Sequence, residues 1–285
     1  MTARTFGAIA PWVLAPAAGL LLAPGPAQTT LASAVTTPAE VSAATAMTAA
    51  PPATTPTATT ADPGQADDNF PYSAKFALAR IRFDVPMQFG LGGNGPPWAH
   101  DFPRAETNLM RIVEATTSIN LYQGGGNIFT LDDPELFRYP VAYLVEPGFW
   151  RPTDVEVSRL REYLLKGGFM IVDDFRGDHI YNFDAQMRRI LPDFKFEVLD
   201  TSDPIFDSFF GIESLDFEAP YGGLDPVYLG IYENGDTSQR LMAIVNYNND
   251  IGDYWEWSDA GIIPIDLSNE AFKLGVNYLV YGLTH

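Results

Sequence analysis

The stretch GGFMIVDDF, Gly167–Phe175, decides the fold of this chain. Two glycines are followed by four apolar residues and then by Asp173 and Asp174 side by side. A short apolar run bounded by turn residues is typical of a buried strand. The stretch therefore raises the question of why a buried strand ends on two adjacent negative charges.

The residues before this stretch predict an alternation of strands and helices. Val141–Val145 is a continuous apolar run, as found in strands that are covered on both faces. The segment that follows it, TDVEVSRLREYLLKGG, has helical spacing. Thr153 and Glu156 have the spacing of a capping box, and Gly167 follows the last turn. Phe76–Phe83, FALARIRF, has the character of a further strand.

Weaker patterns complete the predicted order. Apolar residues at helical spacing predict helices over 104–117, 179–193 and 268–283, the last of them capped at its SNE start. The segment 118–122 is a short strand candidate that the glycines at 124–126 punctuate, and Asn234-Gly235-Asp236 predicts a hairpin. Strands alternating with helices indicate an α/β fold with a mostly parallel sheet covered on both faces.

This fold gives a first answer to the question of the two aspartates. In parallel sheets, ligands bind beyond the carboxyl ends of the strands. Asp173 and Asp174 leave the predicted sheet at that edge, so we expect that their charges need not be buried. Adjacent strand residues face opposite ways. One is therefore expected to point into a site, and the other to cap a helix or pair with an arginine.

The N-terminal region predicts export. After Arg4 an uncharged apolar run extends to Ala23, and Ala32-Ser33-Ala34 is a small-x-small cleavage signal, so residues 1–34 are predicted to be a signal peptide. The alternative is an uncleaved anchor, but prolines leave the run short of a spanning helix, and no membrane span is expected in the mature chain. Residues 35–68, rich in Ala, Thr and Pro, are predicted to be a disordered linker. Residues 69–285 then form one periplasmic or extracellular domain.

Composition excludes several classes of function. The 285 residues carry a formal net charge of −19, and so acidic a surface repels phosphate backbones, which excludes nucleic acid as a partner. The same surface suits cations or neutral polar ligands. Because the chain has no cysteine, disulfides, thiolate metal sites and cysteine nucleophiles are excluded as well.

Five separated motifs resemble one bacterial family. They are WAHDFPRAETNL, YPVAYLVEPG, LREYLLKGGFMIVDDF, NNDIGDYWEW and FKLGVNYLVYGL. In order and spacing they resemble the domain of unknown function 4159 family over Phe76–Leu283. The resemblance implies a single domain similar to class I glutamine amidotransferase-like and ThuA-like domains, which are flavodoxin-like three-layer sandwiches. It implies no established activity.

The chain departs from these families in two places. Where the family usually has His-Pro before an apolar pair, this chain has Asp203-Pro204, so any role of that histidine is missing. In amidotransferase-like folds the turn after the Gly-Gly strand carries a nucleophilic cysteine. Here that turn carries Asp173 and Asp174, and the resemblance therefore does not extend to glutamine hydrolysis by the usual route.

Seven acidic residues are expected at strand or loop ends: Asp101, Glu146, Asp173, Asp174, Asp250, Asp253 and Glu256. Converging carboxylates bind hard cations, and Asp174, Asp250 and Asp253 are the candidate ligands for Ca²⁺ or Mg²⁺, because 249–253 has a loop-like spacing. Alternatively, Asp173 or Asp174 acts as nucleophile or base in hydrolysis. The structural alternative is that the acids cap helices or pair with arginines. Those arginines are Arg80, Arg82, Arg104 and Arg176.

Aromatic residues lie close to these acids in sequence. Trp98 and Trp255 are candidates for covering the apolar face of a neutral sugar, with burial in the core as the alternative. His100 and His179 are too few and too far apart in sequence to indicate a zinc site.

Together these patterns predict an exported, non-enzymatic domain that binds a small polar ligand or an envelope partner at the carboxyl edge of its sheet. The first alternative is a metal- or carboxylate-dependent hydrolase of a glycan or ester that uses Asp173 or Asp174. The second is a structural component of an envelope assembly. No cofactor is predicted beyond a divalent cation, Ca²⁺ or Mg²⁺, at the acids.

Overall fold

Seven strands form one sheet within the residues that the structure, a computed structural model, describes: 69–85, 95–216, 220 and 222–285. The strand order is β2-β1-β3-β4-β7-β6-β5. The first five strands in this order are mutually parallel, and β6 and β5 are antiparallel additions. The predicted α/β fold with a mostly parallel sheet is confirmed. The predicted signal peptide, 1–34, and linker, 35–68, lie outside the described residues.

The strands are β1 Phe76–Ile81, β2 Leu121–Phe129, β3 Val141–Val145, β4 Phe169–Phe175, β5 Glu197–Val198, β6 Val227–Tyr232 and β7 Leu241–Tyr247. The helices are α1 Arg104–Thr116, α2 Asp154–Leu165, α3 His179–Ile190, α4 Ile251–Glu256 and α5 Ile265–Thr284. In the described part of the chain, four short 3₁₀ segments lie between them: Pro97–Ala99, Pro134–Arg138, Pro204–Asp207 and Glu233–Gly235. Among the described helices, none is both long and apolar enough to cross a membrane.

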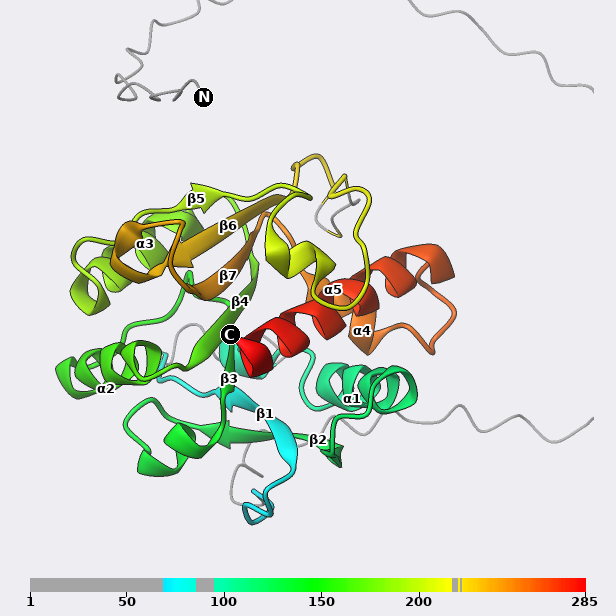
Figure 1. The fold of residues 1–285 in the computed structure, drawn as a ribbon, viewed down its shortest axis with the longest axis horizontal. Coiled ribbons are helices and arrows are strands. Elements are labelled where there is room, and N and C mark those ends of the chain that lie inside the picture. The colour runs from blue at the N-terminus through cyan, green and yellow to red at the C-terminus, as the bar shows by residue number, and fades with distance from the viewer. Residues whose placement is uncertain (1–68, 86–94, 217–219, 221) are drawn as a thin grey trace, which may run out of the picture. The chain divides into compact units, whose positions relative to one another are not determined.

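The helices cover both faces of the sheet (Figure 1). Helices α1, α4 and α5 pack on one face, where Leu109, Trp255 and Leu279 belong to one apolar cluster. Helices α2 and α3 pack on the other, where Leu160 and Phe183 belong to a second cluster. Burial of both faces explains why the central strands are apolar at nearly every position rather than at alternate ones.

Several local predictions are confirmed residue by residue. Strand β3 has the predicted bounds, and α2 begins with the predicted capping box: Glu156 N donates to Thr153 Oγ1 at 3.3 Å, and Thr153 N donates to Glu156 Oε2 at 2.8 Å. Gly167 follows the helix with φ +106°, in the left-handed region that favours glycine. The Asn234-Gly235 turn joins β6 to β7 as an antiparallel hairpin.

Three boundaries differ from the predictions. Strand β2 continues through 124–126 instead of ending there, because a Cβ at Gly126 would lie only 2.6 Å from Leu78 O and glycine permits this close approach of β2 to β1. Helix α5 begins at Ile265, before the predicted SNE start, and its N-terminus has no side-chain cap. The 249–253 segment, predicted to be loop-like, contributes the start of α4.

The surroundings of the two aspartates at the end of β4 differ from the prediction. The strand continues through both aspartates, and a bulge between Val172 and Phe175 accommodates them. Asp173 is 0% exposed and Asp174 is 5% exposed, so the expectation that their charges need not be buried is wrong. The physical reason is that α4, which follows β7, packs against β4 near this end of the strand.

Candidate functional site

The seven predicted acids lie around the carboxyl ends of four parallel strands. Asp101 precedes α1, Glu146 directly follows β3, and Asp250 follows β7. Asp173 and Asp174 end β4, and Asp253 and Glu256 lie on α4. Groups of side-chain ligand atoms lie within 4.8 Å of one another in three sets: His100–Glu146–Asp174, Asp101–Asp174–Asp250 and Asp101–Asp253–Glu256.

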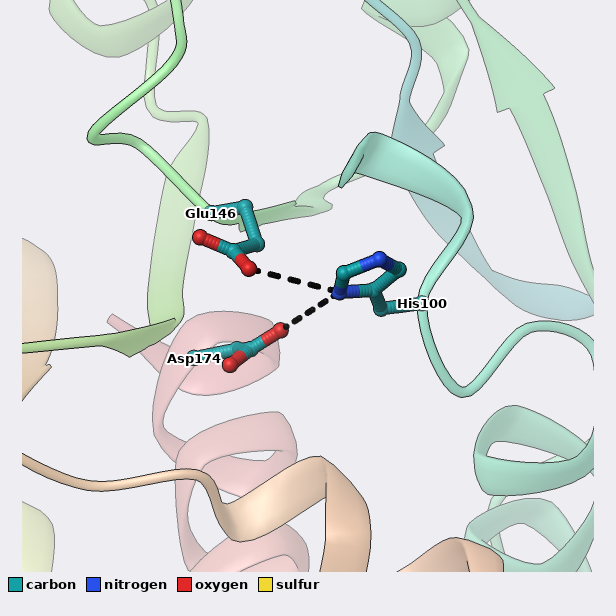
Figure 2. Close-up of side chains that lie close together, drawn as sticks. All are labelled: His100, Glu146 and Asp174. Atoms are coloured by element: carbon teal, nitrogen blue, oxygen red, sulfur yellow. Dashed lines mark ion pairs between the residues drawn. The ribbon is translucent and has the colours of Figure 1, made fainter. Parts of the chain in front are cut away.

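The first set is centred on a histidine nitrogen. Figure 2 shows that Nδ1 of His100 faces two carboxylates, Glu146 Oε1 at 3.3 Å and Asp174 Oδ2 at 3.4 Å. Hydrogen bonds to Asp174 and then to Glu146 raise the pKa of His100 to about 10. A second histidine, His179, places its Nδ1 3.8 Å from the other oxygen of Glu146. A ring nitrogen and two carboxylates offer the mixed nitrogen and oxygen donors with which proteins can hold a metal ion.

Asp173 has a different role from its neighbour. Its Oδ1 accepts from Ile251 N at 3.2 Å, and its Oδ2 accepts from Gly252 N at 2.9 Å and from the Tyr143 hydroxyl at 2.8 Å. Burial raises the pKa of Asp173 to about 6, against the opposing effect of the Tyr143 hydrogen bond. Asp173 therefore ties the N-terminus of α4 to β4, whereas Asp174 faces His100. The contacts of Asp173 are those expected of the aspartate that caps a helix, and Asp174 is the one that faces the other candidate ligands.

Backbone conformation at the site is unusual. Asp101, Glu146 and Asp174 have φ values of +64°, +50° and +56°, all in the left-handed region that non-glycine residues rarely occupy. Such conformations cost free energy, and the surrounding fold maintains them most often at functional sites. Of these three residues, Asp174 shares one set of ligand atoms with Glu146 and another with Asp101.

The site concentrates negative charge. Burial and then the charge of Asp174 raise the pKa values of Asp101 and Asp250 well above the ordinary range. Burial is also the main cause of the raised pKa values of Glu146, Asp253 and Glu256. Carboxylates that are removed from water beside other carboxylates hold protons tightly. The site therefore favours uptake of positive charge, as protons or as a cation.

Two of the four predicted arginine partners, Arg80 and Arg104, bind other acids. Arg80 pairs with Glu106 at 2.5 Å, and Arg104 pairs with Asp259 at 2.5 Å; neither acid is one of the seven. Arg82 forms no ion pair with any carboxylate in the described part of the chain. Arg80 still acts on the site from a distance, because its charge lowers the pKa of Asp101.

The predicted aromatic contacts to a ligand are not available. Trp98 is 5% exposed and Trp255 is fully buried, with its Nε1 donating to Ala271 O at 2.9 Å. The core alternative is therefore the one that the structure supports for both, because apolar clusters on the two faces of the sheet enclose them. Trp257 is half-buried beside the site, and its Nε1 donates to Asp253 Oδ1 at 3.2 Å.

The predicted metal ligands separate into two sets. Asp174 and Asp250 lie together, but Asp253 belongs with Glu256 and shares only Asp101 with them. Asp250 also caps α4, where its Oδ1 accepts from Asp253 N at 3.0 Å. Sequence reasoning missed His100, whose only local signal is its position beside Asp101 in a segment that follows the first strand.

The Asp203-Pro204 departure lies at a turn. Asp203 Oδ2 accepts from Asp200 N at 2.7 Å, and Pro204 begins a 3₁₀ segment. Tyr232, at the end of the antiparallel strand β6, donates its hydroxyl to Asp203 Oδ1 at 3.3 Å. These contacts give Asp203 a structural role, and it belongs to none of the three sets.

Comparison with known proteins gives one finding. The sequence profile of the family described as "Domain of unknown function (DUF4159)" matches residues 77–283. None of the curated proteins compared with the chain matches it.

Proposed function

We propose a function from the site alone, because the chain belongs to the family described as a domain of unknown function (DUF4159), and that description names no activity. The protein binds a divalent cation at the carboxyl edge of its sheet and uses it to hold a small polar ligand. His100, Glu146 and Asp174 are the protein ligands of the cation.

One observation carries this proposal: His100 Nδ1 lies 3.3 Å and 3.4 Å from two carboxylates inside an excess of buried acids. Without a cation, the imidazolium supplies the positive charge, as the raised pKa of His100 indicates. A cation replaces that proton and takes the neutral nitrogen as its ligand, so cation and proton compete for one place. Three protein ligands leave coordination positions for water or an oxygen-bearing ligand.

Hydrolysis is the second candidate, and the geometry of the aspartates narrows it. Both oxygens of Asp173 accept hydrogen bonds from the backbone of α4, which leaves this residue poorly placed to act as nucleophile or base. Asp174 stands at a bulge in the left-handed conformation and faces His100, so it is the residue to which we assign either role. The substrate would be a glycan or an ester with a bond within reach of the bound cation.

The finer fold assignment is also a proposal. Numbered along the chain, the five parallel strands stand in the order 2-1-3-4-5, which is the order of flavodoxin-like folds, and this supports the relation to amidotransferase-like and ThuA-like domains. Export to the periplasm or the extracellular space rests on the sequence of residues 1–34 alone. A structural role in an envelope assembly has no particular contact in its favour.

Thermal unfolding of the full chain tests the cation proposal. Melts are recorded in chelator and then with Ca²⁺, Mg²⁺, Mn²⁺ or Zn²⁺. A cation at 100 times its dissociation constant is expected to stabilise the folded state by about 2.7 kcal/mol. His100→Gln and Asp174→Asn should abolish the shift.

Asp193→Asn is the matched control, because Asp193 is exposed and its carbonyl lies beside Gly235 in the β6–β7 turn. This variant should respond to the cation like the wild type. If the thermal shift persists in both site variants, the cation binds at a place other than His100, Glu146 and Asp174. No shift with any cation would contradict the proposal.

A further inference from the structure

Two of the three ligand sets at the site overlap in Asp174. Asp174 belongs both to the histidine set with His100 and Glu146 and to the all-carboxylate set with Asp101 and Asp250. We propose that a second divalent cation binds in the Asp101–Asp174–Asp250 set, with the Asp174 carboxylate bridging the two ions. This inference rests on the proposed function, since it adds an ion next to the first one.

The shared residue is built to face both sets. A carboxylate has two oxygens, and Oδ2 of Asp174 is the atom 3.4 Å from His100 Nδ1. The bulge at the end of β4 and a φ of +56° hold this side chain between the loop that carries His100 and Asp101 and the N-terminus of α4. Asp174 is 5% exposed, so protein atoms rather than solvent surround it.

Asp101 provides an observation that is independent of the clustering. Its Oδ2 is enclosed by protein and has no hydrogen-bond partner among the described residues. The atom lies against the first turn of α4, where a Cβ on Gly252 would approach it to 2.5 Å. Leaving a buried carboxylate oxygen without a donor is costly. A cation between Asp101 and its neighbours removes that cost.

Two members of this set, Asp101 and Asp250, form no ion pair in the described part of the chain. Asp250 is 5% exposed, and its Oδ1 is engaged by Asp253 N in capping α4. Arg80 is paired with Glu106 at 2.5 Å, and the positive charge of His100 reaches this set through Asp174 Oδ2 at 3.4 Å.

The two sets differ in chemistry, and this predicts different ions. The set with His100 offers a nitrogen and suits Mn²⁺ or Zn²⁺, whereas the set with Asp101 and Asp250 offers only oxygens and suits Mg²⁺, Ca²⁺ or Mn²⁺. Mn²⁺ is acceptable to both. In proteins with two metals held by shared ligands, the ions lie about 3.5–4 Å apart and act on one bound group together.

The test is the number of Mn²⁺ ions that the full chain binds. Equilibrium dialysis with metal analysis counts the ions, and electron paramagnetic resonance reports whether they are close enough to couple. The wild type should bind two ions with a coupled signal. Asp250→Asn should bind one ion with the signal of an isolated Mn²⁺, and Asp193→Asn should behave like the wild type.

The outcomes separate this inference from the proposed function. One ion in the wild type, unchanged in Asp250→Asn and lost in His100→Gln, would overturn the second site and leave the first. Two uncoupled ions would also overturn it, because a shared Asp174 requires proximity. No bound Mn²⁺, together with no thermal shift by any cation, would overturn both. If Asp250→Asn fails to fold, Asp101→Asn replaces it, because this variant removes another ligand of the second ion and should also bind one Mn²⁺.

Discussion

Two groups of buried charges lie close together in this protein and are completed in different ways. Arg80 and Glu106 are both 0% exposed and pair at 2.5 Å, and the Arg80 guanidinium also lies over the Tyr143 ring at 4.5 Å. The acidic cluster has several carboxylates, with His100 between two of them. The first group is neutral when the chain folds, whereas the second needs protons or a cation from outside. That difference distinguishes a structural ion pair from the cluster at which we propose binding.

Breaking the neutral pair should give the largest effect. Arg80→Met leaves Glu106 buried without its partner, and we expect a loss of about 3–5 kcal/mol in the free energy of unfolding. Urea titrations with and without a divalent cation measure it, and the loss should be the same in both. The double variant with Glu106→Gln should recover part of the stability. A loss below about 1 kcal/mol in the single variant would mean that the pair is not needed by the fold.

The acidic cluster should instead respond to pH. The pKa of Asp173 rises from 3.8 to about 6 and that of His100 from 6.5 to about 10, so the folded state binds both protons more tightly than the unfolded state. For Asp173 stability is lost as pH rises from about 4 to about 6, and for His100 it is present below about 6.5 and lost toward about 10.

In chelator, the free energy of unfolding should therefore fall between pH 5 and pH 9, with about 1.4 kcal/mol from Asp173 up to pH 6. The His100 contribution would be about 3.4 kcal/mol at full strength, but the side chain is 28% exposed and solvent screening reduces it, so we expect a total of about 3 kcal/mol. Urea titrations across this range measure the change. His100→Gln should flatten the part above pH 6.5. If the free energy of unfolding instead rises between pH 5 and pH 9, the pKa values of Asp173 and His100 are not raised in the folded state.

The two adjacent aspartates of the acidic cluster should respond differently to the same substitution. Asp173→Asn replaces one of the two carboxylate oxygens, of which Oδ1 accepts from Ile251 N and Oδ2 from Gly252 N, and should cost about 2 kcal/mol in chelator. Asp174→Asn should change stability less but abolish the response to the cation. Calorimetric melts of both variants, with and without Mn²⁺, measure the contrast. Equal losses of stability in the two variants would mean that both aspartates have a structural role.

The smallest expected effect has the opposite sign. Asp250→Asn removes one like charge and keeps an oxygen that accepts from Asp253 N, so in chelator it should stabilise the fold by about 1 kcal/mol. With Mn²⁺ the variant should gain less than the wild type does. Melts under the two conditions measure both effects, and destabilisation in chelator would show that the charge of Asp250 is needed without a metal.

Elements with a complete local pattern could be predicted from the sequence. Examples are the apolar runs of β3 and β4 and the Thr153–Glu156 capping box. Each can be recognised locally, because strand burial and helix capping depend on residues that are neighbours in the sequence. Helix α4 cannot be recognised in this way. It has six residues, and carboxylates from β4 and from Asp250 cap its N-terminus, so its formation depends partly on a contact 78 residues away.

The candidate site was predicted in its acids but not in its centre. The rule that ligands bind at the carboxyl edge of a parallel sheet brought the seven acids together correctly, since that rule follows from topology. His100 was set aside because a histidine is informative only beside its partners, and Glu146 and Asp174 are 46 and 74 residues away. The sequence leaves Trp98 and Trp255 between ligand contact and core, because an aromatic side chain near acids in sequence is suited to either, and the structure buries both.

The sequence by itself determined the layers of the fold, the direction of its central strands and the edge at which the acids gather, because these depend on patterns repeated along the chain. Only the tertiary structure decided that Asp173 ties α4 to β4 while Asp174 faces His100. Alternation along a strand says that two neighbouring side chains diverge. What each of them meets depends on the segments that the fold brings to either side, and those segments are distant in sequence.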